Sequence, residues 1–148
     1  MTLLEKISVE LKASMLARDA DRTGALRMLK SAVGYTQIEK KTESLSDADV
    51  LVVVQKEAKR RRDSIEEFDK GGRPELAAKE RAELKVLEAF LPTPLTPEEL
   101  ETLVRAAIAE TGATGKKEMG VVMKAAQARA DGRADGKALS QCVGRLLP

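Results

Sequence analysis

The chain of 148 residues contains no histidine, no tryptophan and no asparagine, and it has a single cysteine. Without histidine, the side chain most often used as a general base and metal ligand is missing, and Ser–His or Cys–His nucleophile pairs cannot form within the chain. One cysteine, Cys142, allows no internal disulfide, which fits a reducing compartment. We therefore expect no catalytic residues, no metal and no cofactor in this chain, and a cytoplasmic location.

Aromatic residues make up only 2% of the chain, against 43% hydrophobic residues overall. A core built from these must be aliphatic, and the abundant Ala, Leu, Lys, Glu and Arg are strong helix formers. β-Branched residues, which favour strands, are scarce outside the run 50–54. No signal peptide and no apolar run of membrane-spanning length is visible, so we expect no membrane partner. Composition thus predicts an all-α fold.

Capping residues and prolines divide the chain into seven expected helices. Three prolines between Leu91 and Pro97 exclude a helix there and mark a linker, which separates predicted domains at 1–92 and 93–148. We expect an N-terminal unit of about four helices, arranged as a long helical hairpin or bundle, and a small three-helix C-terminal unit. The expected helices begin at the Thr2–Glu5 capping box, near Arg22 (to Lys41), at the Ser46–Asp49 box (to Lys70), at Pro74 (to about Pro92), at the Thr96–Glu99 box (to Gly112), near Gly115 (to Gln127) and at Asp135 (to Leu147).

The segment 56–63 is the most unusual part of the sequence. At 100° per residue, Lys56, Lys59 and Arg60 share the helix face opposite the apolar stripe, and such a cationic strip binds phosphate backbones by displacing counterions. Arg61 and Arg62 fall beside the apolar stripe and are expected to pair with acidic residues of another helix. The alternative is an ordinary solvated helix face with ion pairs between successive turns.

Further basic residues are candidates for the same role. The net charge is only +2, but residues 111–148 hold seven basic and three acidic residues. Arg133 and Lys137 flank the start of the last expected helix, where free amides favour an anion, although a plain connector between helices explains them as well. The candidate nucleic-acid-binding residues are Arg27, Lys30, Lys56, Lys59, Arg60, Lys116, Lys124, Arg133 and Lys137.

Other features have structural explanations. The Met119–Met123 stripe and Cys142 have the spacing of core residues. Gly120 inside a helix indicates close approach of another backbone, from a neighbouring helix or a ligand, and we expect helix packing to be the reason. The run Val50–Val54 is apolar around the whole start of its helix, which raises the possibility of a protein-interaction module with no nucleic-acid role.

Five segments together resemble the signature segments of the GatB/YqeY family, in matching order and over essentially the whole chain. They are 26–32 (LRMLKSA), 59–65 (KRRRDSI), 90–92 (FLP), 119–123 (MGVVM) and 132–136 (GRADG). Two positions depart from the family pattern: Val121 stands where the family usually has lysine, and Ser140 where it often has asparagine. The loss of that lysine removes one candidate phosphate contact.

This resemblance implies a helical N-terminal unit followed by a three-helix unit. The family is similar to the C-terminal tail of GatB, a subunit of the tRNA-dependent amidotransferase, and to tails on some glutaminyl-tRNA synthetases. In both settings the tail is associated with holding the tRNA. The resemblance therefore implies a tRNA-binding accessory module, with an amidotransferase subunit or an aminoacyl-tRNA synthetase as possible partners and no DNA sequence specificity. The carbon–nitrogen ligase activity with glutamine as amide donor belongs to the whole amidotransferase, and we do not expect it of this chain by itself.

Overall fold

The computed structural model describes all 148 residues and contains helices and turns but no strands, which confirms the predicted all-α class. The chain divides into two compact units, an N-terminal unit of Met1–Leu91 and a C-terminal unit of Pro92–Pro148. No helix combines the length and the apolar character needed to cross a membrane. The N-terminal unit contains α1 (Leu3–Leu16), α2 (Ala20–Glu39), α3 (Asp47–Lys70) and α4 (Pro74–Glu88), and the C-terminal unit contains α5 (Pro97–Thr111), the short 3₁₀ helix η1 (Lys116–Glu118), α6 (Met119–Ala130) and α7 (Gly136–Leu146).

Local side-chain contacts start most of these helices. The Thr2 hydroxyl accepts a hydrogen bond from the Glu5 amide while the Glu5 carboxylate accepts one from the Thr2 amide, so the predicted capping box is present. Helix α2 begins two residues earlier than expected, because Asp19 caps it by accepting from the Arg22 amide. The side chains of Ser46, Thr96 and Asp135 cap α3, α5 and α7 in the same way.

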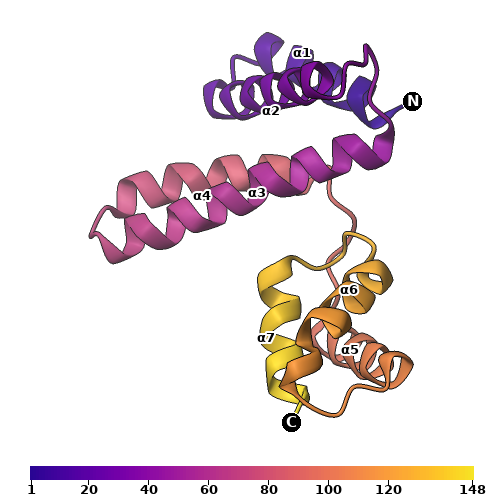
Figure 1. Ribbon diagram of the computed structural model, residues 1–148. Coiled ribbons are helices and arrows are strands. Elements are labelled where there is room, and N and C mark those ends of the chain that lie inside the picture. The colour runs from indigo at the N-terminus through magenta and orange to yellow at the C-terminus, as the bar shows by residue number, and fades with distance from the viewer. The chain divides into compact units, whose positions relative to one another are not determined.

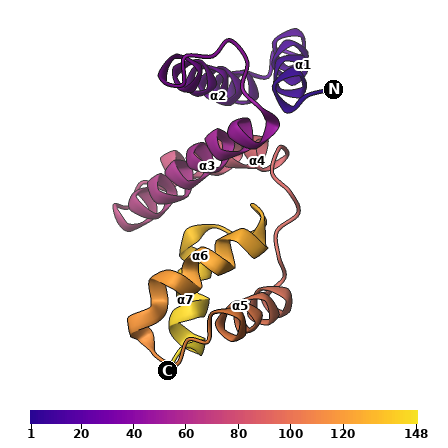
Figure 2. The same cartoon turned by 45° about the vertical axis from the view of Figure 1, so that its right-hand side comes forward.

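In the N-terminal unit, α3 and α4 form a long antiparallel hairpin, and α1 and α2 pack beside it (Figure 1, Figure 2). Gly72 closes the hairpin in the left-handed conformation, with φ of +69°, which favours glycine. The run Val50–Val54 supplies the start of α3, and the interpretation of this run as a partner surface is wrong for most of it, since it faces the core. The buried core of this unit comprises Ile7, Leu29, Val33, Leu45, Val50, Val53, Val54 and Leu87.

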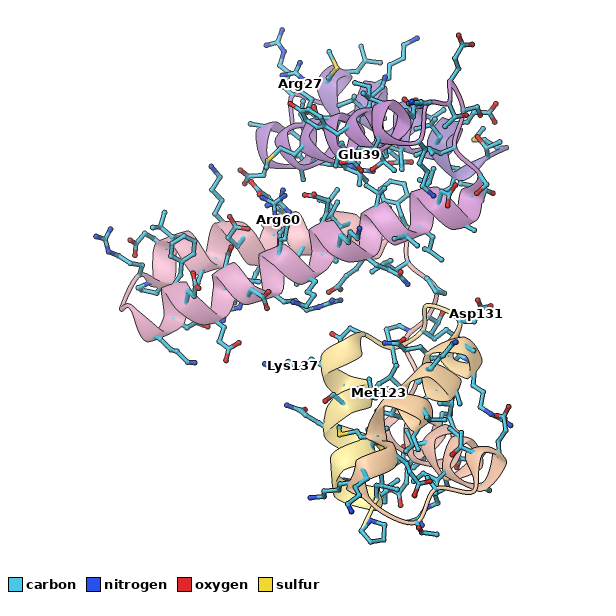
Figure 3. The ribbon with its side chains drawn as sticks, in the orientation of Figure 1. Arg27, Glu39, Arg60, Met123, Asp131 and Lys137 are labelled. Atoms are coloured by element: carbon cyan, nitrogen blue, oxygen red, sulfur yellow. The ribbon has the colours of Figure 1, made fainter.

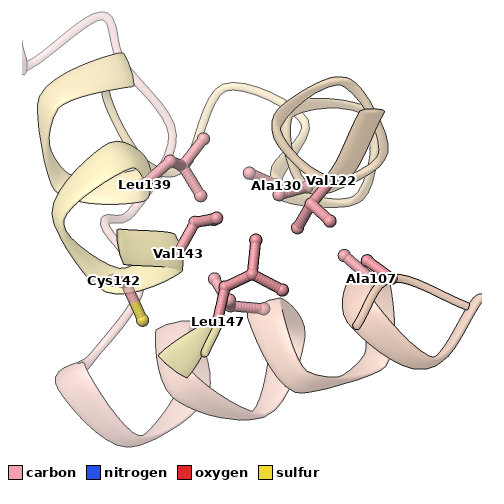
Figure 4. Close-up of a cluster of buried hydrophobic side chains, with 10 residues drawn as sticks. Ala107, Val122, Ala130, Leu139, Cys142, Val143 and Leu147 are labelled. Carbon is pink, nitrogen blue, oxygen red and sulfur yellow. The ribbon is translucent and has the colours of Figure 1, made fainter. Parts of the chain in front are cut away.

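In the C-terminal unit, α5, α6 and α7 surround a second core. Ala107, Val122, Leu139, Val143 and Leu147 meet at its centre (Figure 4). The predictions that Cys142 is buried and that the methionines of α6 pack on the core are confirmed.

The bounds predicted for the helix over 115–127 are wrong at both ends. A 3₁₀ turn precedes α6, and α6 continues to Ala130, where Asp131 ends it in the left-handed conformation, with φ of +46°. Aspartate adopts this conformation more readily than most residues. The helix can therefore continue beyond Gln127, the end expected from the sequence, and end at Asp131.

Candidate nucleic-acid interface

The cationic strip predicted on α3 lies on the surface but is partly neutralised. Lys56, Lys59 and Arg60 are all exposed. Lys59 lies 3.2 Å from the carboxylate of Asp63, and Arg60 lies 3.2 Å from that of Glu57 (Figure 3 labels Arg60). Only Lys56 among the three has no carboxylate partner. Two of the three charges are therefore already compensated on their own helix, as the alternative interpretation of a solvated, ion-paired face predicts.

Arg61, one residue further, points into the N-terminal unit. Its guanidinium donates to Glu83 and, at 3.0 Å, to Glu80, both on α4, and its Nη2 lies 3.5 Å from the Met28 sulfur on α2. The prediction that Arg61 pairs with acidic residues of another helix is confirmed. Because two carboxylates of α4 pair with the buried Arg61 guanidinium, this cluster holds helices together and leaves no charge for an external ligand. The Nε of Arg61 is buried without a hydrogen-bond partner.

Arg27 and Lys30 lie on the exposed side of α2. Figure 3 shows Arg27 on the side of α2 turned away from α3. Neither side chain has a hydrogen bond or an ion pair in this structure. The same side carries Tyr35 and Ile38, both largely exposed. Their spacing from the buried stripe of α2 places Tyr35 and Ile38 on its opposite face, and this spacing is the signal in the sequence that indicates their exposure.

In the C-terminal unit, every arginine pairs with a glutamate. Arg129 binds Glu110 at 2.9 Å, Arg105 binds Glu101 at 2.7 Å, and Arg145 lies 4.0 Å from that same carboxylate. These pairs remove the arginines and their glutamates from the charge available to a ligand.

Arg133 also acts within the unit. Its Nε donates to the carbonyl of Thr93 at 2.9 Å and its Nη2 donates to Glu99 at 3.0 Å, while its own carbonyl accepts from the Leu95 amide at 2.9 Å. These three bonds fix the beginning of the unit onto the turn between α6 and α7. The predicted phosphate contact of Arg133 would have to compete with this intramolecular clamp.

The lysines of this unit differ from its arginines. Lys116, Lys117 and Lys124 are exposed and have no ion pair, and they lie along η1 and the outer face of α6 beside the exposed Gly120 and Val121. The nearby acid, Glu118, accepts from the amide and hydroxyl of Thr114 at 3.3 Å. Lys137, at the start of α7 (Figure 3), is exposed but already takes part in an interaction. Uncompensated positive charge therefore gathers at η1 and α6.

Packing does not explain Gly120. A Cβ built on it meets nothing within 4 Å, so the prediction that a neighbouring backbone of the same chain approaches here is wrong. The open space instead leaves the helix backbone accessible between Lys117 and Lys124.

Two carboxylates show the effect of their cationic neighbours. The hydrogen bond from Lys40, together with the Lys40 charge and Ser46, lowers the pKa of Asp49. The hydrogen bond and charge of Arg105, with a smaller effect of Arg145, lower the pKa of Glu101.

Nowhere in the chain do three or more Asp, Glu, Cys or His side chains gather as a set that could hold a metal ion.

The chain is thus a two-unit, all-helical protein, with exposed lysines on its smaller unit and arginines that pair with glutamates there. The model of the YqeY-like protein family matches residues 4–147, and the chain therefore belongs to this family.

The chain is similar to several curated proteins of yeasts, whose names state no biochemical activity. An uncharacterised protein of Schizosaccharomyces pombe is 36% identical over 86 residues, which cover 58% of this chain and 69% of the relative. The "Altered inheritance of mitochondria protein 41, mitochondrial" of Vanderwaltozyma polyspora is 31% identical over 97 residues, or 64% of this chain and 52% of the relative. Its namesake in Kluyveromyces lactis is 36% identical over 81 residues, or 55% of this chain and 44% of the relative. This chain thus spans about half the length of the mitochondrial relatives.

These names correct the expected cytoplasmic location. The named relatives are mitochondrial proteins, which points away from a cytoplasmic location. The physical reason is simple: a single cysteine excludes an internal disulfide in any compartment, so it specifies none.

Proposed function

We propose that this chain is a tRNA-binding accessory module, with η1 and the outer face of α6 as the principal contact surface. The observation that carries the proposal is the separation of roles among the cations of the C-terminal unit. Its four arginines are paired with glutamates, whereas Lys116, Lys117 and Lys124 are exposed and have no ion pair. Uncompensated lysines release counterions when they meet phosphates, which is the main source of affinity for a folded RNA.

The geometry favours recognition of the RNA backbone over its bases. No aromatic residue lies in the C-terminal unit, so base stacking is not available there. The open backbone at Gly120 lets a phosphate approach α6 closely. Lys56 on α3 is a second, separate contact. Kinship with the GatB tail supports tRNA as the RNA concerned, and an amidotransferase subunit or an aminoacyl-tRNA synthetase as the associated protein.

The test is a set of binding isotherms with total tRNA at several salt concentrations. Replacing Lys116, Lys117 and Lys124 together by alanine should reduce the slope of log K against log salt by about three, because each lost phosphate contact removes roughly one unit. A control variant in which Lys79 and Lys85 are replaced by alanine removes exposed, unpaired lysines of α4 and should leave the slope unchanged.

Two results would contradict the proposal. The first is wild-type binding no tighter than that of an unrelated protein with the same net charge. The second is an equal loss of affinity in the α4 control, since this would show that only overall charge matters.

A further inference from the structure

Helix α2 has a buried face and a largely exposed face, and on the exposed face the Met28 sulfur lies 3.5 Å from Nη2 of the buried Arg61. Leu26, Leu29 and Val33 are buried against the other helices. On the opposite side, Met28, Tyr35 and Ile38 are 52%, 71% and 74% exposed. Large apolar side chains in such a row are unusual on the surface of a protein that needs no partner.

The exposed row follows the spacing of a helix that packs against another helix. Its positions are separated alternately by four and three residues, which is the repeat that keeps one seam facing a partner helix. The row consists of Gly24, Met28, Ser31, Tyr35 and Ile38.

Two glycines in α2 indicate where a partner would come close. A Cβ added to Gly24 or to Gly34 meets nothing within 4 Å, so the packing of this chain does not require glycine at either position. Glycine weakens a helix relative to alanine. A shallow groove runs past Gly34 between Ser31, Tyr35, Ile38 and Lys41.

Charge along the seam identifies the partner. Arg27 and Lys30 lie toward one edge of the seam, Lys41 lines the groove just beyond the end of the helix, and none of the three has an ion pair. Glu39 lies on the other edge, and Glu43 follows the end of the helix beside the groove. The cationic edge favours acidic residues on the molecule that covers it.

A second copy of α2 fits this surface poorly. A second copy would bring the same unpaired cations, Arg27 and Lys30, to the seam. Like charges in that position are destabilising. RNA would satisfy the cations but would leave Met28 and Ile38 without apolar contact.

We propose that the seam Gly24–Met28–Ser31–Tyr35–Ile38 of α2 binds an amphipathic helix of a partner protein, whose apolar stripe is flanked by acidic residues. Met28, Tyr35 and Ile38 interdigitate with the apolar stripe, Gly34 lets the two backbones approach, and Arg27, Lys30 and Lys41 pair with the acids. This docking site lies in the N-terminal unit and is independent of the proposed tRNA surface.

The test uses two fluorescein-labelled helical peptides of four heptads, with leucine at the seam positions. One has glutamate at the flanking positions and the other has lysine. In anisotropy titrations against the full chain, the acidic peptide should bind at least about tenfold more tightly than the basic one. The double variant Arg27→Glu, Lys41→Glu should reverse this preference.

Two further variants test the seam itself. Gly34→Gln adds a side chain into space that is open in this chain, so the variant should fold normally. Its affinity for the acidic peptide should be at least about tenfold lower than that of the wild type. Val9→Glu changes a residue of α1 that is 52% exposed and should leave peptide affinity unchanged. Gly34→Gln, which changes no charge, should keep the wild-type isotherm with tRNA, which separates this proposal from the previous one.

Three outcomes would overturn the docking proposal. The first is equal affinity for the two peptides, and the second is a Gly34→Gln variant that binds the acidic peptide as tightly as the wild type does. The third is a loss of tRNA affinity in Gly34→Gln, which would assign the surface to RNA. Sizing chromatography adds a fourth: a dimer of the wild-type chain that Ile38→Glu dissociates would show that a second copy covers the seam.

Discussion

Replacing Arg61 by leucine should destabilise the N-terminal unit far more than replacing Lys59 on the same helix. The Arg61 side chain is 6% exposed and that of its partner Glu83 is 10% exposed. Removing the guanidinium leaves the Glu83 carboxylate in a buried place without its compensating charge. Breaking one member of a buried ion pair typically costs about 3–5 kcal/mol.

The surroundings determine where in that range the cost falls. Glu80, the second partner, is 24% exposed and can recover hydration, so only Glu83 suffers the full loss. We therefore expect a decrease in the free energy of unfolding near the lower limit, about 3 kcal/mol. For a unit of this size such a change lowers Tm by roughly 12–24 °C.

The measurement is urea unfolding followed by far-UV circular dichroism, with hydrogen exchange detected by mass spectrometry to assign the change to α3 and α4. Lys59→Leu is the matched control, since Lys59 is on the same helix and pairs with Asp63, but both side chains are more than half exposed. Exposed pairs of this kind contribute about 0.3–0.5 kcal/mol.

A double variant distinguishes a lost ion pair from a packing defect. Arg61→Leu combined with Glu83→Leu removes both charges, and such replacements are often neutral or stabilising. The unsatisfied Nε of Arg61 supports this expectation, because the wild-type cluster already contains one buried donor without a partner. The reasoning would be refuted if Arg61→Leu lowered the free energy of unfolding by no more than Lys59→Leu does. It would also be refuted if the double variant were less stable than Arg61→Leu alone.

Two further predictions concern α2 and its junction with α3. Gly34→Ala should stabilise the chain by roughly 1 kcal/mol, because alanine is the better helix former and the added Cβ meets nothing; an unchanged or lower Tm in thermal unfolding would contradict this. The lowered pKa of Asp49 means that its bond with Lys40 contributes stability above the ordinary aspartate range and loses it as the pH falls through the folded-state pKa. The difference in unfolding free energy between wild type and Asp49→Asn should therefore shrink below about pH 4, and a difference that persists at pH 2 would exclude this cause.

The sequence was most informative where contacts are local. The caps at Thr2, Thr96 and Asp135 were predictable because each hydroxyl or carboxylate binds an amide only three residues away. The end of α6 was not predictable in this way. The left-handed residue that ends it is Asp131, whereas a sequence pattern favours glycine at such a position. Helix types and order thus followed from pattern, while exact ends did not.

The candidate site was less predictable, because charge compensation depends on which helices meet. The partners of Arg61 lie 19 and 22 residues away along the chain, and those of Arg133 lie 34 and 40 residues away. No spacing rule predicts such pairs. A count of basic residues treats Arg133 and Lys124 alike, although the structure gives only Arg133 an internal partner.

The division between arginine and lysine has a physical basis. The guanidinium group presents donors in a planar fork, so it can hold a carboxylate and a carbonyl at once, as Arg133 does with Glu99 and Thr93. An ammonium group is compact and strongly hydrated, and it loses less when it stays in water until a polyanion arrives. A small unit can therefore be nearly neutral in total and still present a cationic surface, provided that its acids are held by arginines and its lysines are left on one face. If this is how the C-terminal unit works, Glu110→Gln should release Arg129 and raise tRNA affinity, whereas Lys124→Gln, an opposite change in net charge, should lower it; unchanged affinity in Glu110→Gln would count against the idea that these ion pairs limit the charge offered to RNA.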